Sequence, residues 1–177
     1  MTRPYDAQLG LARLAQRVRG SLSTDLPALF ALTDPLRTPD PVAFANRLAP
    51  GTGLVYRHFG APDRFHTGLQ LAELAKARGL LLFVSGDSDL ADRIGAHGIH
   101  WPERLLGQAG SRRMRGDGRP FTASVHSAGA SFRATRAGID GVFHSTVFAS
   151  HSVSAGRPHG IHAAAALARS TDMAVFP

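Results

Sequence analysis

One internal repeat constrains the fold of this chain more than any other feature of its sequence. The segments Arg93–His100 and Arg136–Phe143 share a helix end, a glycine, a two-residue turn and a strand that begins at a second glycine. Equivalent residues lie 43 positions apart, which fits the length of two β/α units. The repeat therefore predicts alternating strands and helices, and such alternation favours a parallel sheet covered by helices.

Apolar runs and amphipathic segments extend this alternation along the chain. A short apolar run bounded by turn residues indicates a buried strand, and apolar residues at helical spacing indicate a helix. The predicted strands are 26–33, 51–57, 80–84, 98–100, 121–125, 141–143 and 173–176, and the predicted helices are 5–22, 41–48, 67–78, 89–94, 131–137 and 161–169. We expect helix N-caps at Asp40, which is followed by Pro41, and at Asp89. We expect two helices to end at Gly79 and Gly95.

Seven strands in this pattern predict an α/β fold of the TIM type, a (β/α)8 barrel of which seven strands are readable. The missing strand has three explanations that stay open: a chain cut short, an incomplete barrel, or a gap filled by a partner chain. An open barrel end would favour a homodimer that covers its exposed edge. A doubly wound sheet is the structural alternative, although no Gly-x-Gly-x-x-Gly turn follows the first strand. We expect a single domain, 1–177, with residues 1–25 forming a helix outside the barrel.

The composition excludes several classes of protein. The chain has no cysteine, which rules out disulfide bonds, thiolate metal sites and cysteine nucleophiles. No apolar run approaches the ~20 residues that cross a bilayer, and no signal-peptide block follows the N-terminal arginines, so we expect a cytoplasmic protein without a membrane partner. The nine histidines show no spacing typical of a metal site.

The positive charge of the chain favours a phosphorylated small molecule as its partner. The net charge of +7 attracts anions. The densest cluster of arginines, from Arg112 to Arg119, is expected to lie in a glycine-rich loop and has no interleaved aromatic residues, which argues against nucleic acid. Nucleic-acid binding by this cluster stays a third hypothesis, and it predicts a steep salt dependence.

A set of short motifs follows the ends of the predicted strands. In chain order the motifs are Leu32–Pro35, Gly51–Arg57, Asp87–Ala91, Gly95–His100, Ala123–Ser127, Gly138–Val142, Val147–Phe148 and Gly160. In this order and spacing, from about Leu29 to Pro177, the chain resembles the thiamine phosphate synthase and thiazole tautomerase family. The resemblance implies a (β/α)8 barrel with its active site at the carboxyl ends of the strands.

The synthase of this family joins a pyrimidine diphosphate to a thiazole phosphate with Mg²⁺, so the resemblance implies a small phosphorylated thiazole or pyrimidine ligand. It implies Asp87 as a Mg²⁺ ligand, with Glu103 as a substitute for a second acid. Arg57 matches one cation of the family's strand-two pattern, displaced by one residue. Ser150 and Ser152 match a Thr-x-Thr-Lys loop that here lacks its lysine, and this loop and Arg57 are expected to bind phosphate.

The related tautomerase needs only a proton shuttle and a phosphate anchor. His126 matches the histidine proposed as acid/base in that branch, and an imidazole both accepts and donates protons near neutral pH. Ser124 is expected to contact the substrate. His100 either lines the same active site at the carboxyl ends of the strands or packs in the core. We favour an enzyme, a synthase or a tautomerase, over a non-catalytic descendant that binds a thiamine precursor or acts as a partner subunit.

Overall fold

The structure, a computed structural model, describes residues 10–11, 13–15, 17, 25–149 and 157–177, which fall into two compact units on either side of the bond between His97 and Gly98. Within the predicted helix 5–22, the described residues are helical and the others lie outside the description. Among the described residues no helix is both long and apolar enough to cross a membrane. The prediction of one domain stays a prediction.

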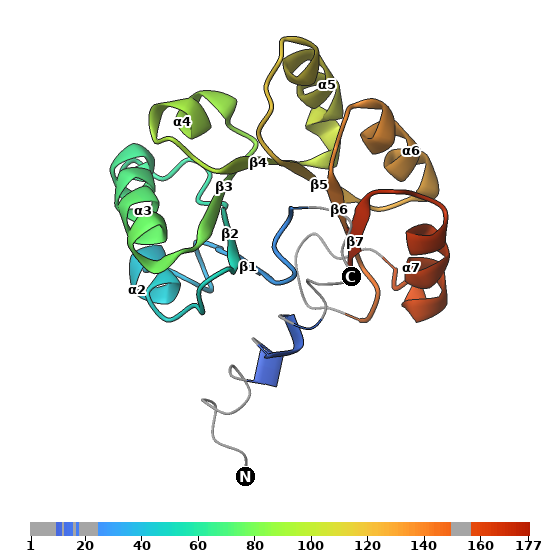
Figure 1. Ribbon diagram of the computed structural model, residues 1–177, viewed down its shortest axis with the longest axis horizontal. Coiled ribbons are helices and arrows are strands. Elements are labelled where there is room, and N and C mark those ends of the chain that lie inside the picture. The colour runs from blue at the N-terminus through green and yellow to red at the C-terminus, as the bar shows by residue number, and fades with distance from the viewer. Residues whose placement is uncertain (1–9, 12, 16, 18–24, 150–156) are drawn as a thin grey trace. The chain divides into compact units, whose positions relative to one another are not determined.

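The first unit holds three parallel strands in chain order: β1 (Phe30–Leu32), β2 (Gly53–Tyr56) and β3 (Leu81–Ser85). Its helices are α2 (Pro41–Ala45), α3 (Arg64–Arg78) and α4 (Ser88–Arg93), and they cover one side of these strands (Figure 1). α2 begins as predicted, because the Asp40 carboxylate accepts the N–H group of Ala43 at 2.8 Å and Pro41 takes the first helical position.

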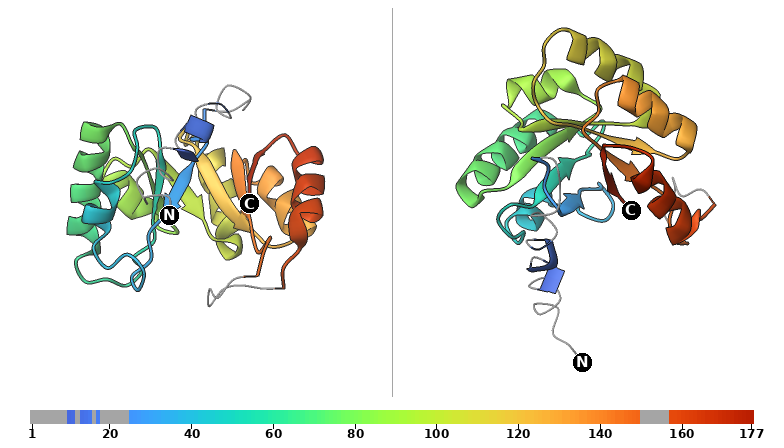
Figure 2. Two further views of the ribbon diagram at one scale, coloured as in Figure 1. Left: turned by 90° about the horizontal axis from the view of Figure 1, so that it is seen from below. Right: turned by 45° about the vertical axis from the view of Figure 1, so that its right-hand side comes forward.

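The second unit holds four parallel strands in chain order: β4 (Gly98–Trp101), β5 (Phe121–Val125), β6 (Gly141–His144) and β7 (Ala174–Phe176). The 3₁₀ turn η1 (Glu103–Leu105) leads into α5 (Leu106–Met114), and α6 (Ala128–Arg136) and α7 (Gly160–Arg169) follow. Helices α6 and α7 lie side by side (Figure 2). In both units the strand order follows the chain without reversal, as in a β/α barrel and unlike a doubly wound sheet.

The repeat predicted from the sequence is present in the backbone. Gly95 follows α4 with φ +64°, and Gly138 follows α6 with φ +70°, a conformation that glycine adopts without a steric penalty. In each copy the next amide donates to the carbonyl five residues earlier, at 2.9 Å for Ala96 and 3.2 Å for Ile139. The two helix ends are therefore one motif used twice.

Apart from shifts in the bounds of some strands and helices, such as α3 and α6, which each begin three residues earlier than predicted, two local predictions are wrong. The segment from Arg112 to Arg119 is not a loop throughout, because α5 contains both Arg112 and Arg113. Two glycines lower the helix propensity of α5, and the burial of Leu106 and Ala109 overrides them.

The second correction concerns the start of α4. Asp87, not Asp89, is the N-cap, and its carboxylate accepts the N–H group of Leu90 at 2.9 Å. The helix begins one residue earlier than predicted, at Ser88, which places Asp89 in the first turn. An acid in the first turn still complements the helix dipole, so the same residue type suits both positions.

Pairing register sorts the strand side chains of the second unit into two faces. Paired residues point to the same side and successive residues to opposite sides. Arg113 of α5 lies over the ring of Phe121 at 4.0 Å from its centroid, so the face of Phe121 is covered by helices. His144 shares that face, because it pairs with Val125, four residues after Phe121. The opposite face carries His100, Thr122, Ser124, Phe143 and Phe176.

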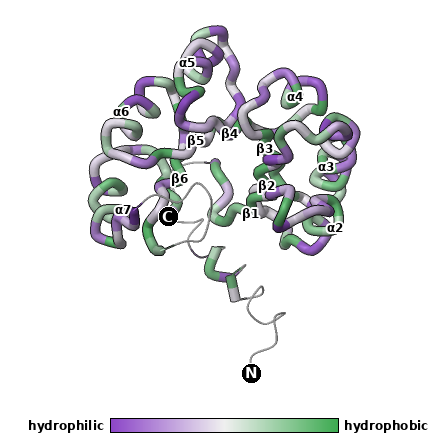
Figure 3. Tube along the Cα trace, turned by 180° about the vertical axis from the view of Figure 1, so that it is seen from behind, coloured by the Kyte–Doolittle hydropathy of each residue, from purple (hydrophilic) through white to green (hydrophobic). Residues whose placement is uncertain are grey.

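Hydrophilic residues gather on the outer turns of the helices (Figure 3).

Candidate functional site

His126 follows β5 directly and exposes its imidazole to solvent. Its Nδ1 atom lies 2.8 Å from the carbonyl oxygen of Ser145. A carbonyl oxygen only accepts hydrogen bonds, so Nδ1 carries the proton and Nε2 keeps the lone pair. The neutral imidazole is therefore a base at Nε2.

The same geometry argues against a serine nucleophile at this point. The hydroxyl oxygen of Ser145 lies 3.3 Å from Nδ1 of His126, a distance that suggests a Ser–His pair. Activation of the hydroxyl would need the lone pair of the imidazole to face it. The shorter contact with the carbonyl assigns the proton to Nδ1, so this nitrogen has no lone pair for Ser145.

Glu103, in η1, holds the backbone of His126 in place. Its Oε2 atom accepts the N–H group of His126 at 3.2 Å, and its Oε1 atom accepts from Nη2 of Arg133 in α6 at 2.7 Å. Both carboxylate oxygens are therefore engaged. Glu103 is a positioning residue here, and the second metal ligand predicted from the resemblance is already used.

His100 lies on the face of β4 that is not covered by helices and is 3% exposed. Its Nδ1 atom is 3.0 Å from the hydroxyl of Thr122, and its Nε2 atom is 2.9 Å from the hydroxyl of Ser124. The ring of Phe143 packs edge-on at 5.1 Å between centroids. Of the two roles predicted for His100, this geometry favours packing, and the contact of Ser124 with substrate stays a prediction.

In the first unit, the hydroxyl of Thr33 organises the end of β2. It accepts the backbone N–H group of Arg57 at 2.9 Å and lies 3.1 Å from Nδ1 of His58. Nε2 of His58 donates to the carbonyl of Thr38 at 3.1 Å, so Nδ1 accepts the hydroxyl proton. His58 is buried and satisfied. Arg57 is half-buried. Its guanidinium makes no hydrogen bond or salt bridge within the described part of the chain, and its charge interacts with the carboxylate of Asp34.

Asp87 follows β3, and both of its carboxylate oxygens are occupied. Oδ1 caps α4, and Oδ2 pairs with Nη1 of Arg64 at 2.5 Å. Arg64 opens α3 and also donates to the carbonyl of Ser85 at 3.1 Å. In the described ranges no three His, Asp or Glu side chains come close enough to hold a metal ion. These residues do not fit a Mg²⁺ site, because Asp87 would have to release its cation first.

Two residues of these strand ends were missed by sequence reasoning, Arg64 and His144. Nothing in a helix-opening arginine signals that its side chain reaches the next strand. His144 is 5% exposed, and neither ring nitrogen has a hydrogen-bond partner among the described residues. The sequence did contain a sign of His144: it is a polar residue at a position of β6 whose side chain, by strand alternation, points to the helix-covered face. Ser150 and Ser152 lie outside the described residues, so the predicted phosphate loop stays a prediction.

Burial lowers the pKa of His144 below its usual value. The imidazoles of His159 and His126 lower it further, while the nearby backbone of Val125 opposes the shift. The ring of His159 stacks on that of His144 at 5.5 Å between centroids. His144 is therefore neutral near pH 7.

Fold and site together define a β/α-barrel protein whose candidate residues follow the carboxyl ends of its strands. A solved structure of thiamine phosphate pyrophosphorylase from Pyrococcus furiosus has a TM-score of 0.68 at 22% identity, covering 83% of this chain and 72% of its own. A second, described as native KDPGal, has a TM-score of 0.55 at 20% identity and covers 86% of this chain and 72% of its own. The predicted fold class is confirmed.

A family model described as thiamine monophosphate synthase matches residues 45–177, so the chain belongs to this family, as the motifs predicted. The thiamine biosynthesis bifunctional protein ThiM/ThiE of Symbiobacterium thermophilum is 29% identical over 115 residues, which are 64% of this chain and 24% of that protein. The chain thus spans about a quarter of the length of this curated relative.

Proposed function

We propose that the protein acts in thiamine biosynthesis and binds a thiazole phosphate, with tautomerisation of the thiazole ring as its reaction. The observation that carries the proposal is the fixed tautomer of His126, whose Nδ1–H bond to Ser145 leaves Nε2 as a solvent-facing base. Proton transfer by one positioned histidine contributes about 10²–10⁴ to a rate. A tautomerase needs no further reactive group beyond an anchor for its substrate.

In this reaction Nε2 of His126 removes a proton from a carbon of the non-aromatic thiazole. The electron pair of that C–H bond moves into the ring, and the imidazolium returns a proton to the exocyclic carbon that is double-bonded to the ring, which leaves the ring aromatic. Substrate and product are isomers, so no co-reactant is consumed. Glu103 and the Ser145 carbonyl hold the imidazole in one orientation throughout.

The phosphate of the substrate is assigned to Arg57 and to the loop of Ser150 and Ser152. Support for Arg57 comes from its position after β2 and from a guanidinium that makes no hydrogen bond or salt bridge in the described ranges, although its charge interacts with Asp34. Active sites of β/α barrels lie at the carboxyl ends of the strands, where both groups occur in the chain. A guanidinium binds phosphate through two parallel hydrogen bonds.

Synthase chemistry is less well supported by the same residues. It needs Mg²⁺ and cations for a diphosphate leaving group, and Asp87 is engaged by Arg64 and by the cap of α4. A protein that binds the thiazole phosphate without converting it is the second candidate. Both candidates predict binding of thiazole phosphate, but only the tautomerase converts it to product.

Calorimetric titration with thiazole phosphate, with and without Mg²⁺, tests the proposal together with a proton-exchange assay on the bound ring. Arg57→Ala is expected to weaken binding about tenfold or more, and Arg47→Ala, on an exposed arginine, to leave it unchanged. His126→Gln is expected to keep binding and to slow exchange at least about 100-fold.

Three results would revise the proposal. Absence of binding under all conditions would restrict the family relationship to ancestry. Binding without exchange in the native protein would establish the non-catalytic candidate. Binding that requires Mg²⁺ would favour the synthase.

A further inference from the structure

Glu103 connects the backbone of His126 to the side chain of Arg133. One carboxylate oxygen, Oε2, accepts the amide of His126 at 3.2 Å, and the other, Oε1, accepts from Nη2 of Arg133 at 2.7 Å. Glu103 belongs to η1, which follows β4, His126 follows β5, and Arg133 lies in α6. The connection therefore joins the ends of two neighbouring strands to one helix.

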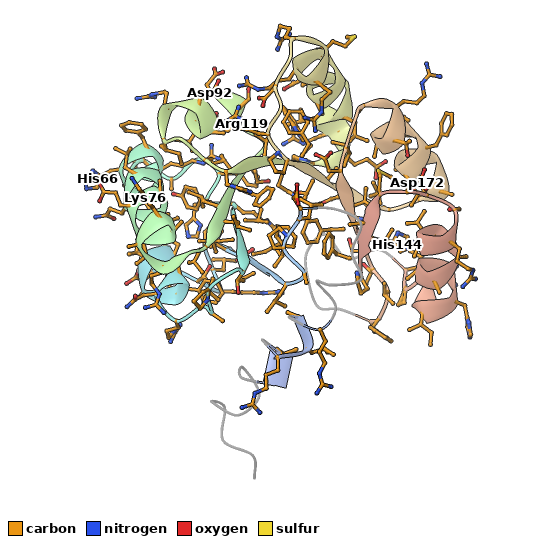
Figure 4. The ribbon with its side chains drawn as sticks, viewed as in Figure 1. His66, Lys76, Asp92, Arg119, His144 and Asp172 are labelled. Atoms are coloured by element: carbon orange, nitrogen blue, oxygen red, sulfur yellow. The ribbon has the colours of Figure 1, made fainter. Side chains whose placement is uncertain are left out.

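The imidazole of His126 is held from the strand on the other side of β5. Its Nδ1 atom donates at 2.8 Å to the carbonyl of Ser145, which directly follows His144, the last residue of β6 (Figure 4). In the sheet β5 lies between β4 and β6. The backbone of His126 is thus held from the β4 side and its ring from the β6 side. Both contacts are needed to fix the position of Nε2.

Of the two contacts of Glu103, the one with Arg133 is the stronger. The distance of 3.2 Å to the amide of His126 is at the long end of the range for N–H···O hydrogen bonds, and this donor is neutral. The contact with the guanidinium is shorter and joins two opposite charges. Glu103 has a flexible side chain, and its ordering costs conformational entropy. Arg133 therefore holds the carboxylate where the weaker contact with His126 forms.

The backbone of α6 explains how Arg133 reaches this place. Side chains of a helix lean toward its N-terminus. Arg133 follows this rule, because a Cβ atom added to Gly129, in the first turn of α6, would lie 3.8 Å from its Nη1 atom. The guanidinium therefore lies over the start of the helix whose N-cap, Ser127, directly follows His126.

We propose that Arg133 is a positioning residue for His126 and acts through Glu103. The inference rests on the proposed function, in which Nε2 of His126 moves protons of the thiazole. A misplacement of about 1 Å at a reacting group costs on the order of 10²-fold in rate. Arg133 itself does not touch the substrate, so its removal lowers kcat and leaves KM unchanged.

Arg133→Met tests the proposal, because it keeps most of the apolar stem and removes the donors. The side chain of Arg133 is 57% exposed, and exposed ion pairs contribute little to stability, so Tm is expected to stay close to the native value. The kcat for thiazole tautomerisation is expected to fall about tenfold at constant KM. Arg133→Lys, which restores a cationic donor, is expected to recover most of the rate. Arg136→Met removes the same charge from an exposed position in the same last turn of α6 and is the matched control.

A second readout needs no substrate. In ¹H–¹⁵N spectra of the free protein, the amide proton of His126 is expected to move upfield in Arg133→Met, because its hydrogen bond to Glu103 is lost. It is expected to stay in place in Arg136→Met. Combining Glu103→Ala with Arg133→Met is expected to lower kcat no further than Glu103→Ala alone, since Arg133 acts through Glu103.

Three results would overturn the role of Arg133. These are an unchanged His126 amide in Arg133→Met, an equal loss of rate in Arg136→Met, and losses that multiply in the double variant. A native protein without tautomerase activity would instead reject the proposed function. The amide shift in the free protein would then still decide whether Arg133 positions His126.

Discussion

The two ends of strands β5 and β6 differ in how completely their polar groups are paired. At the amino ends, Arg113 makes five hydrogen bonds, to Gly138, Asp140 and the backbone carbonyls of Asp117 and Arg119. The carboxylate of Asp140 also accepts the amide of Phe121 at 2.7 Å. Every group in this cluster has a partner, and the guanidinium of Arg113 covers an apolar ring.

At the carboxyl ends of the same strands the pairing is incomplete. His126 keeps a free lone pair on Nε2, and the buried ring of His144 has no hydrogen bond within the described residues. The difference separates a stabilising end from a functional end, as in other β/α barrels. Groups left unpaired lower stability, so an evolved protein keeps them where a ligand pairs them.

Removal of Arg113 tests the amino end and has the largest expected effect. Arg113→Ala leaves the carboxylate of Asp140 without its cation and the carbonyl of Gly138 without its side-chain donor, and should lower the free energy of unfolding by about 3 kcal/mol. Thermal denaturation should show a fall in Tm of roughly 10 °C. Arg115→Ala, at an exposed position just after α5, should change Tm little. Equal losses from both variants would contradict the special role of this end.

Asp117 gives the amino end its pH dependence. The side chain of Arg119 is the main cause of a pKa of Asp117 far below its usual value of 3.8, with Arg112 contributing further. A depressed carboxyl pKa gives stability that is present above about pH 4 and is lost as pH falls toward the folded-state pKa. Asp117→Asn should cost roughly 1–2 kcal/mol at pH 7. Acid titration followed by circular dichroism should show the two proteins converging at low pH, and parallel curves would refute this.

His144→Phe tests the carboxyl end of the strands, and this variant is expected to be more stable than the native protein. Replacing a buried, unpaired imidazole by an apolar ring should stabilise the protein by about 1 kcal/mol at pH 8. The folded-state pKa of His144 lies below its usual value of 6.5, so native stability is full above that pH and falls as pH drops below it. The advantage of the variant should therefore grow toward pH 5 in urea denaturation. A loss of stability at both pH values would mean that His144 is paired in solution.

Ser145→Ala has the smallest expected effect. The carbonyl that orients His126 belongs to the backbone and survives the change, so the ¹⁵N shifts of the imidazole should still report a proton on Nδ1. Stability should change by less than about 0.5 kcal/mol. A proton moved to Nε2 would show that the hydroxyl, and not the carbonyl, sets the tautomer.

Much of the fold was predictable because its signals are local. The glycines after α3, α4 and α6 adopt positive φ as the pattern required, and β5 has the bounds predicted for it. The missed helix α5 shows the limit, since its propensity is poor and the burial of Leu106 and Ala109 decides its state. The wrong prediction of Asp89 as the cap of α4 has another cause: an acid suits both the cap and the first turn of a helix.

The sequence by itself determined the order of the strands, every helix after them except α5, most helix ends and the family, because strand period, cap chemistry and motif spacing act within a few residues. Only the tertiary structure decided which polar groups are paired. The proton of His126 is placed by a carbonyl 19 positions away, and Asp87 is neutralised by an arginine 23 positions away. Three of the five hydrogen bonds of Arg113 go to acceptors 25 to 27 positions away. Such partners meet through packing, which no local pattern records.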